Sequence, residues 1–386
     1  MLSNFLKMKS SKLKKILFFI KIKFLLRNKK NFFIFPFYHI GGAERVHSDI
    51  LKIFSPKNSI CIISDTSENN HFYNEFKSKL QIIEIEKLSI FEKQRTIQCI
   101  LDHINLKKCI VFGCNSKFFY DLIPNFKSQV KVIDLIHAFS YEVKTASEKY
   151  SLPIATRINK RVILGSKTYL DFEKLYQDNE IDSKYLQNLI IIKNKVKISQ
   201  NFPIKPHNEK LKIIFVGRNS FEKRVHIFFK IAELCLIKKI DVKFYVIGNF
   251  DKKTTVKPDN TKIIGEISDV NILNSIYLQS DIIATTSSRE GLPMVMLEGM
   301  ALGVLPISTD VGEISELINV TLVNGFLIPN VTSEKKIIDD FCEKIIFLNQ
   351  NRNLLTEYQK NAYNSVKEKY SEVVFESEYR KLFQKD

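Results

Sequence analysis

The sequence predicts an α/β protein with two Rossmann-like domains, each built on a parallel sheet. Short apolar runs of strand length alternate with longer helical segments up to about residue 200, and the alternation begins again at residue 211. Such alternation indicates βαβ units. The 386 residues exceed one ordinary domain and most simply make two.

The first domain is expected at 32–200, after a basic leader at 1–31. Its expected strands are the apolar runs at 32–38, 59–64, 81–85, 109–113, 130–136, 161–166 and 189–198. Residues 201–210 are polar, carry prolines and show no periodicity, which predicts a linker. The second domain is expected at 211–365, with strands at 211–216, 242–248, 282–284, 305–308 and 326–329. Residues 366–386 predict a final helix.

The composition is strongly basic, with 59 Lys and Arg against 42 Asp and Glu, for a net charge of +17. This charge favours an anionic partner. The six cysteines form no CxxC pair and predict buried free thiols in a reducing cytoplasmic compartment. No nucleic-acid-binding motif accompanies the charge, so a nucleic-acid partner is not expected.

The leader at 1–31 interleaves basic and apolar residues. Its uninterrupted apolar run, Ile16 to Ile20, is too short for a membrane span. The basic residues favour peripheral contact with the inner face of the cytoplasmic membrane; the alternative is an extra packed helix. These residues are Lys12, Lys14, Lys15, Lys21, Lys23, Arg27, Lys29 and Lys30.

The most informative stretch runs from Ser280 to Gly303 and reads as a strand, a polar loop and a buried helix from about Pro293. It carries two carboxylates, Glu290 and Glu298, eight residues apart. Since eight residues are a little over two helical turns, both side chains can face one crevice. With Gly291 and a helix N-terminus between them, the arrangement suits a nucleotide diphosphate-sugar, with phosphate at the helix end and hydroxyls on the carboxylates.

Further candidates follow other predicted strands. Gly41 and Gly42 allow a tight turn between a strand and a helix, where α/β proteins hold ligands. His137 follows the strand at 130–136 and is expected at the carboxyl edge of the first sheet. Arg218 and Lys223 follow the strand at 211–216 and suit a diphosphate. No D-x-D triplet occurs, so no divalent metal or other cofactor is expected.

The residues EGLPMVMLEGMALGVLPISTDVGEISELI resemble the E-x7-E signature of the retaining glycosyltransferases of family 4, which have the GT-B fold. GGAER near the N-terminus and GR with a lysine five residues on are similar to further motifs of this family. The resemblance implies two Rossmann-like domains facing across a cleft, with the acceptor on the first and the donor on the second. It also implies that the final helix returns to the first domain.

The resemblance implies a retaining glycosyltransferase (a hexosyltransferase) that moves a hexose or N-acetylhexosamine, most simply from a UDP-sugar, to a cell-envelope glycan or lipid-linked acceptor. Glu290 would bind sugar hydroxyls, Glu298 ribose hydroxyls, and Arg218 and Lys223 the diphosphate, with His137 beside the sugar. Further donor contacts are expected at Gly217, Gly265, Ile267, Gly291, Leu292 and Pro293, and an acceptor or phosphate loop at Gly41 and Gly42.

Two positions depart from the family pattern. Asn194-Lys195-Val196 stands where N-G-V is common, and Arg224 replaces the glycine that usually follows the lysine. Two alternatives stay open: a non-hydrolysing UDP-sugar epimerase of the same fold, and a catalytically inactive relative that acts as an interaction module.

Overall fold

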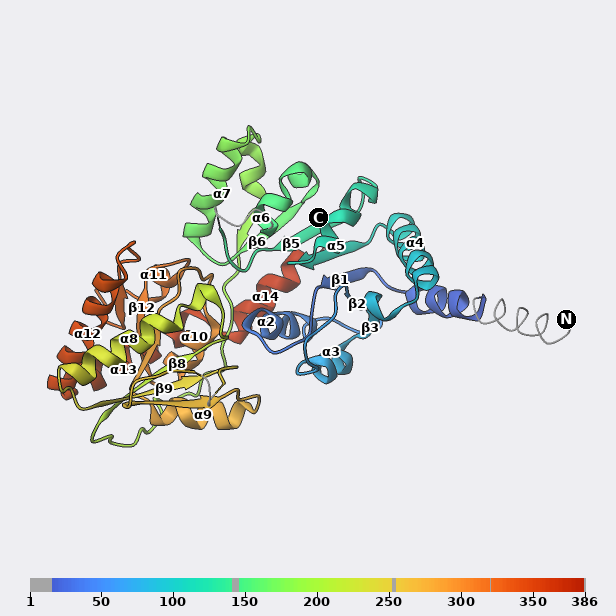
Figure 1. Cartoon of the computed structure of the whole chain (residues 1–386). Coiled ribbons are helices and arrows are strands. Elements are labelled where there is room, and N and C mark those ends of the chain that lie inside the picture. The colour runs from blue at the N-terminus through green and yellow to red at the C-terminus, as the bar shows by residue number, and fades with distance from the viewer. Residues whose placement is uncertain (1–15, 141–145, 252–254, 320, 385–386) are drawn as a thin grey trace, which may run out of the picture.

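The computed structural model describes residues 16–140, 146–251, 255–319 and 321–384, and these residues form two α/β domains joined by an extended linker (Figure 1). Lys12, Lys14 and Lys15 of the predicted leader lie outside the described residues.

The first domain contains a seven-stranded parallel sheet in the order β3-β2-β1-β4-β5-β6-β7. Its strands are β1 (Asn31–Phe35), β2 (Ser59–Ile63), β3 (Gln81–Glu84), β4 (Ile110–Cys114), β5 (Lys131–Leu135), β6 (Lys160–Ile163) and β7 (Leu189–Ile191). Its helices are α2 (Gly42–Leu51), α3 (Tyr73–Lys79), α4 (Ile90–Lys107), α5 (Lys117–Leu122), α6 (Ser147–Tyr150) and α7 (Ser166–Asp178). The interior strands β2 and β4 are buried along their whole length, as expected for a sheet covered by helices on both faces.

The second domain repeats this plan with a six-stranded parallel sheet in the order β10-β9-β8-β11-β12-β13. Its strands are β8 (Leu211–Val216), β9 (Val242–Ile247), β10 (Thr261–Gly265), β11 (Ile282–Thr285), β12 (Leu305–Thr309) and β13 (Phe326–Ile328). Its helices are α8 (Val225–Ile237), α9 (Val270–Gln279), α10 (Met294–Ala301), α11 (Ile314–Leu317), α12 (Glu334–Gln350) and α13 (Arg352–Lys369). Both sheets therefore reverse their strand order once, beside β1 and beside β8, and such switch points are where open α/β sheets bind ligands.

The last helix, α14 (Glu372–Leu382), lies against the first domain (Figure 1). Phe383 directly after it stacks on Phe33 of β1, with ring centroids 5.3 Å apart, and Tyr379 contacts the ring of Phe112 in β4 edge-on at 6.1 Å. The end of the chain thus contributes aromatic side chains to the core of the first domain.

The predicted leader is helical over 16–26 and packs on the first domain through Ile22 and Leu26, which are buried. None of the described helices combines the length and the apolarity that crossing a bilayer requires. All six cysteines are buried free thiols, as predicted.

Candidate active site

A cleft of about 400 Å³ lies between the two domains. Its walls are loops that follow strands of the two sheets, together with residues of α2, α9 and α10, so the carboxyl edges of both sheets meet there. Twelve of the thirteen predicted site residues line it: Gly41, Gly42, His137, Gly217, Arg218, Lys223, Ile267, Glu290, Gly291, Leu292, Pro293 and Glu298. The other, Gly265, ends β10 with a φ of 99°, and its carbonyl accepts a hydrogen bond from the backbone N–H of Gly248 at 3.0 Å.

Glu290 and Lys223 form an ion pair in the cleft. The ammonium of Lys223 donates to Glu290 Oε1 at 2.6 Å, and the hydroxyl of Ser287 donates to the same oxygen at 2.6 Å. The side chains are only 9% and 18% exposed for Glu290 and Lys223, respectively. This shielded pair ties the loop after β11 to the loop after β8, because each loop supplies one partner.

Arg218 is much more exposed than Lys223. Its side chain is 61% exposed, and its guanidinium lies 4.0 Å from the carboxylate of Glu222. Its charge also acts across the cleft on Glu44 of α2: burial raises the pKa of Glu44, and Arg218 is among the groups that oppose this rise. Arg218 is therefore a solvated cation at the cleft, able to turn toward an anionic ligand.

Arg224, the departure from the family's glycine, adopts the left-handed conformation with φ 45° and ψ 47°. Glycine is the residue that usually takes this conformation without strain. The guanidinium donates to the carbonyls of Thr286 and Ser287 at 2.7 and 2.8 Å and to Asn330 at 2.8 Å. These charge-assisted bonds offset the backbone strain and hold the loop beside Lys223.

Glu298 lies in α10 and is half-buried. Burial raises the pKa of its carboxyl, because a charge is less stable away from water, and the charge of Arg45 in α2 opposes this rise. Arg45 belongs to the first domain, so the charge state of this carboxyl depends on contact between the two domains.

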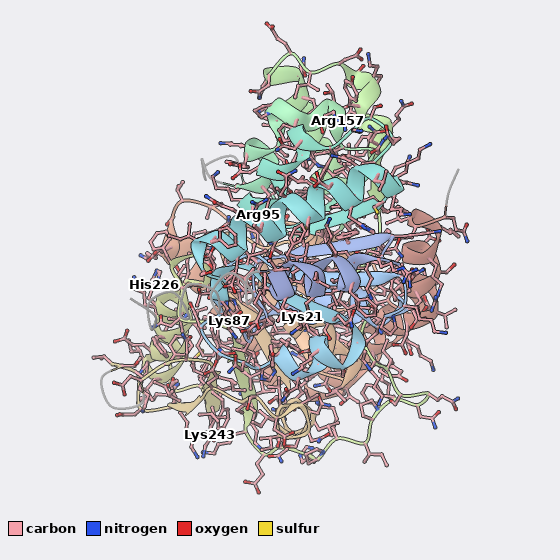
Figure 2. The ribbon with its side chains drawn as sticks, turned by 90° about the vertical axis from the view of Figure 1, so that its right-hand side faces the viewer. Lys21, Lys87, Arg95, Arg157, His226 and Lys243 are labelled. Atoms are coloured by element: carbon pink, nitrogen blue, oxygen red, sulfur yellow. The ribbon has the colours of Figure 1, made fainter. Side chains whose placement is uncertain are left out.

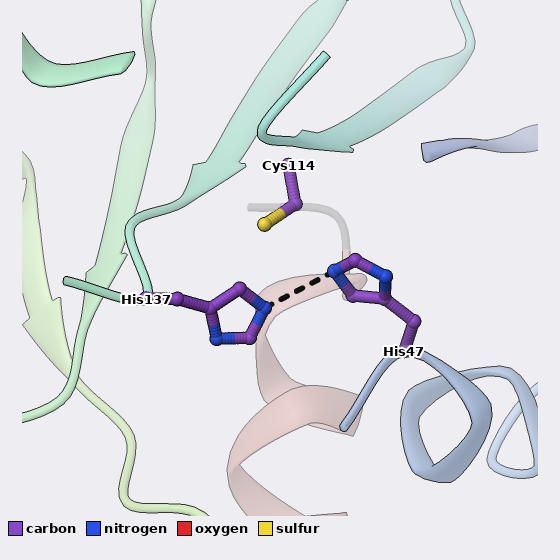
Figure 3. Close-up of side chains that lie close together, drawn as sticks. All are labelled: His47, Cys114 and His137. Carbon is purple, nitrogen blue, oxygen red and sulfur yellow. Dashed lines mark hydrogen bonds between the residues drawn. The ribbon is translucent and has the colours of Figure 1, made fainter. Parts of the chain in front are cut away.

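His137 follows β5 by two residues and lines the cleft. Its Nε2 lies 3.1 Å from Nε2 of His47 in α2, as Figure 3 shows. Burial lowers the pKa of His137 to about 4 and lowers that of His47 well below its ordinary value. Both rings are therefore neutral at pH 7, and a neutral pair can share one hydrogen bond.

Gly41 and Gly42 lie at the N-terminus of α2, and the carboxylate of Glu44 covers this end of the helix. Glu44 is buried, and a Cβ at Gly41 would lie 2.2 Å from its Oε2. His39 approaches the same carboxylate at 3.5 Å. A larger residue at position 41 would therefore clash with the side chain of Glu44, so a glycine is needed here whether or not a ligand approaches.

The two domains touch through backbone at the cleft. A Cβ at Gly291 would lie 1.6 Å from the carbonyl oxygen of His137, so only glycine allows this approach. Arg289 donates to the carbonyls of Ala138 and Phe139 at 3.1 and 3.3 Å. The loop that carries Glu290 is therefore docked on the segment that carries His137.

A second interdomain contact caps α7. This helix has no side-chain cap of its own, and Gly165 occupies its N-cap position. Glu313 accepts from the backbone N–H and the hydroxyl of Thr168 at 2.8 and 2.5 Å, and Glu316 accepts from the N–H and hydroxyl of Ser166, both at 2.5 Å. Two carboxylates of the second domain thus satisfy free N–H groups at the positive end of a helix in the first.

Sequence reasoning assigned no role to Arg45, His47, Cys114, Arg289 or Glu313. Their importance depends on contacts between separate helices, strands and loops, such as His47 with His137, 90 residues apart, and no local pattern records such contacts. Arg45 had one signal, its place in GGAER.

Residues 197–365 match the family described as glycosyl transferases group 1. The poly(ribitol-phosphate) α-N-acetylglucosaminyltransferase of Staphylococcus aureus (strain COL) is 28% identical over 237 residues, which cover 58% of this chain and 44% of that protein. The O-antigen biosynthesis glycosyltransferase WbnH of Escherichia coli is 28% identical over 175 residues, or 42% of this chain and 48% of that protein. The chain spans about half the length of these curated relatives.

A solved structure extends the likeness over both domains. The pneumococcal O-GlcNAc transferase GtfA, crystallised with UDP and GlcNAc, superposes with a TM-score of 0.72 at 12% identity, covering 92% of this chain and 98% of that one. At this identity the likeness concerns the fold. The fold is therefore GT-B, as predicted, and the part of the chain that supplies Glu290 and Glu298 matches the glycosyl transferases group 1 family.

Proposed function

We propose that this protein is a retaining glycosyltransferase of family 4 that transfers a hexose or N-acetylhexosamine from a UDP-sugar to a cell-envelope glycan or lipid-linked acceptor. One observation carries the proposal: a single cleft gathers Glu290, Glu298, Lys223, Arg218 and His137 from two domains. The family match of the second domain and the UDP bound by the similar structure support it.

In this proposal the second domain binds the donor. Glu298 accepts hydrogen bonds from the ribose hydroxyls, and Ile267 contacts the base. Lys223 has three N–H donors, so it can keep its bond to Glu290 and add bonds to the diphosphate. Arg218, exposed at the cleft, turns onto the same phosphates. Glu290, fixed by Lys223 and Ser287, accepts from hydroxyls of the sugar.

Transfer with retention then needs no protein nucleophile. The acceptor hydroxyl attacks the anomeric carbon on the face that the diphosphate leaves, and its proton passes to an oxygen of the departing phosphate. The protein's contribution is to hold the reactants and stabilise the charge of the leaving group. Since Lys223 and Arg218 supply that stabilisation, the proposal includes no divalent metal.

The test is thermal unfolding with UDP, GDP, ADP or CMP, each with and without EDTA. A ligand at 100 times its Kd stabilises the folded state by about 2.7 kcal/mol, so specific binding is measurable. We expect UDP to raise the Tm equally with and without EDTA. Glu298→Gln should abolish most of the shift, whereas Glu233→Gln, at an exposed position of α8, should retain it.

Activity separates the remaining alternatives. Glu290→Gln should bind UDP but lose transfer, because the change keeps the shape of the side chain and removes the charge paired with Lys223. Conversion of the UDP-sugar to its epimer would favour the epimerase alternative. Folded protein that binds no nucleotide would contradict the proposal and favour the inactive relative.

We also propose that the enzyme works at the inner face of the cytoplasmic membrane, bound through the segment at 16–26. Ile16, Leu17 and Ile20 are each 56% exposed, and Phe24 is 76% exposed. Positions 16, 20 and 24 follow the i, i+4 spacing of one helix face. Basic side chains accompany this face, and Figure 2 looks onto the side of the molecule where Lys21, Lys87 and Arg95 lie.

This proposal is tested by sedimentation with vesicles that contain anionic lipid. Deleting the whole leader is unsuitable, because Ile22 and Leu26 belong to the core. Ile20→Ser with Phe24→Ser removes only exposed apolar surface and should reduce sedimentation. Ile237→Ser, at a 70% exposed position in the second domain, should not. Equal sedimentation of all three proteins would contradict a role for this face.

A further inference from the structure

Three side chains with metal-binding atoms converge beneath the first-domain wall of the cleft (Figure 3). His47 comes from α2, Cys114 ends β4, and His137 follows β5. Two imidazole nitrogens and one sulfur all lie within 4.8 Å of one another, and the two Nε2 atoms are 3.1 Å apart. His47 and Cys114 are buried, whereas His137 reaches the cleft.

The donor atoms select a class of ion. Thiolate and imidazole are ligands of Zn²⁺ and other borderline or soft metals, whereas Mg²⁺ and Ca²⁺ prefer oxygen. In a tetrahedral zinc site, bond lengths of about 2.0 Å to nitrogen and 2.3 Å to sulfur place the ligand atoms about 3.4 to 3.6 Å apart. The observed separations, at most 4.8 Å, therefore differ from these distances by no more than about 1.2 to 1.4 Å.

The imidazole rings of His47 and His137 already lie close to the orientation that metal binding requires. His47 stacks on Phe35 with ring centroids 4.0 Å apart and an interplanar angle of 3°, which fixes its plane. Its Nε2 already points at His137 (Figure 3). The Nδ1 of His47 is buried and has no hydrogen-bond partner among the described residues. Because a partner there usually strengthens zinc ligation 10- to 100-fold, we expect an affinity below that of dedicated structural zinc sites.

We propose that His47, Cys114 and His137 bind one Zn²⁺ ion, and that the bound ion inhibits glycosyl transfer. Each imidazole binds through Nε2 and keeps its proton on Nδ1, and the Cys114 thiol releases its proton to solvent. Three protein ligands leave a fourth position for water or an anion from the cleft. The inhibition rests on the proposed function, because it follows from drawing His137 away from the donor sugar. The binding of Zn²⁺ does not depend on the proposed function.

Binding is tested on the full-length protein without nucleotide, in a non-thiol reductant. Co²⁺ replaces Zn²⁺ as the probe, since a thiolate bound to cobalt produces a charge-transfer absorption band. We expect one Co²⁺ per chain with this band, and competition by Zn²⁺. Cys114→Ser should abolish the band and His47→Gln should weaken binding by at least tenfold.

Cys61→Ser is the matched control, because Cys61 is equally buried and lies in β2 of the same sheet. It should bind like the unmodified protein, and circular dichroism establishes that each variant is folded. No charge-transfer band from the unmodified protein, or equal loss in Cys61→Ser and Cys114→Ser, would overturn the site.

The effect on activity is tested separately. Zn²⁺ should inhibit the unmodified enzyme and Cys61→Ser, and inhibit Cys114→Ser much less, while UDP binding to the second domain stays constant. Cobalt binding without any inhibition would overturn the inhibitory role. Cobalt binding by a protein that binds no UDP would contradict the proposed function and leave the metal site standing.

Discussion

Gly291→Ala should separate binding of the nucleotide from transfer. The added Cβ would lie 1.6 Å from the carbonyl oxygen of His137 and 2.8 Å from its carbon. Non-bonded contacts of a Cβ atom essentially never fall below 3.0 Å, so the two segments must move apart by about 1.4 Å. Backbone atoms lie on both sides of this contact, so a change of rotamer cannot relieve it.

The displacement acts between the domains. The segment of His137 belongs to the first domain, and the loop of Glu290 and Gly291 belongs to the second. A misplacement of about 1 Å between reacting groups can lower a rate about 100-fold. We therefore expect kcat/KM to fall by about 100-fold. UDP binding should change little, because Glu298 and Lys223 belong to the second domain with Gly291.

The assay combines three measurements on one preparation: calorimetric titration with UDP, release of UDP from the donor sugar in the presence of acceptor, and small-angle scattering. Gly299→Ala is the control, because the nearest atoms to a Cβ there would belong to Ile283 and Tyr277 at 3.5 Å or more, an ordinary contact. A Gly291→Ala protein with unchanged radius of gyration and unchanged turnover would refute the claim that this glycine allows closure.

Three further predictions concern stability. Burial lowers the pKa of His137 to about 4, so below about pH 6.5 the unfolded chain binds a proton that the folded protein does not. The free energy of unfolding, measured by urea titration at several pH values, should therefore fall by up to about 3 kcal/mol between about pH 6.5 and 4. This fall should be smaller in His137→Gln and unchanged in the control His207→Gln. Arg161→Met should cost about 3–5 kcal/mol, because it leaves the fully buried Asp134 without its ion pair, and a double variant with Asp134→Leu should recover most of this loss in urea unfolding. Glu313→Ala should cost about 1 kcal/mol by removing a helix cap and should speed hydrogen exchange at the Thr168 amide; unchanged exchange there would contradict the interdomain cap.

Much of the fold could be predicted from the sequence because its signals are local. Most of the apolar runs that predicted strands coincide with β-strands to within a few residues, as at Leu211–Val216 and Ser59–Ile63. The run at 189–198 is an exception, because only Leu189–Ile191 is a strand there. Parallel strands buried on both faces need continuous apolar runs, so each run marks its own strand. The alternation with helices then implied the two parallel sheets.

Only part of the candidate site could be predicted from such local signals. Residues that directly follow strands, such as His137 and Arg218, could be placed at a sheet edge because the edge follows from the topology. The assignment of Lys223 to the diphosphate did not include its ion pair with Glu290, 67 residues away in sequence. Pairing between two loops depends on how their strands are ordered in the sheet.

The sequence by itself determined the two α/β domains and the residue types at the strand ends. Only the tertiary structure decided that the backbone of Gly291 meets His137, that Glu313 caps a helix of the other domain, and that His47 and Cys114 join His137. The physical reason is the separation along the chain over which each kind of interaction acts. Periodicity and turn chemistry act between neighbours in the chain, whereas these contacts join elements from different parts of the chain and depend on packing the whole chain into one structure.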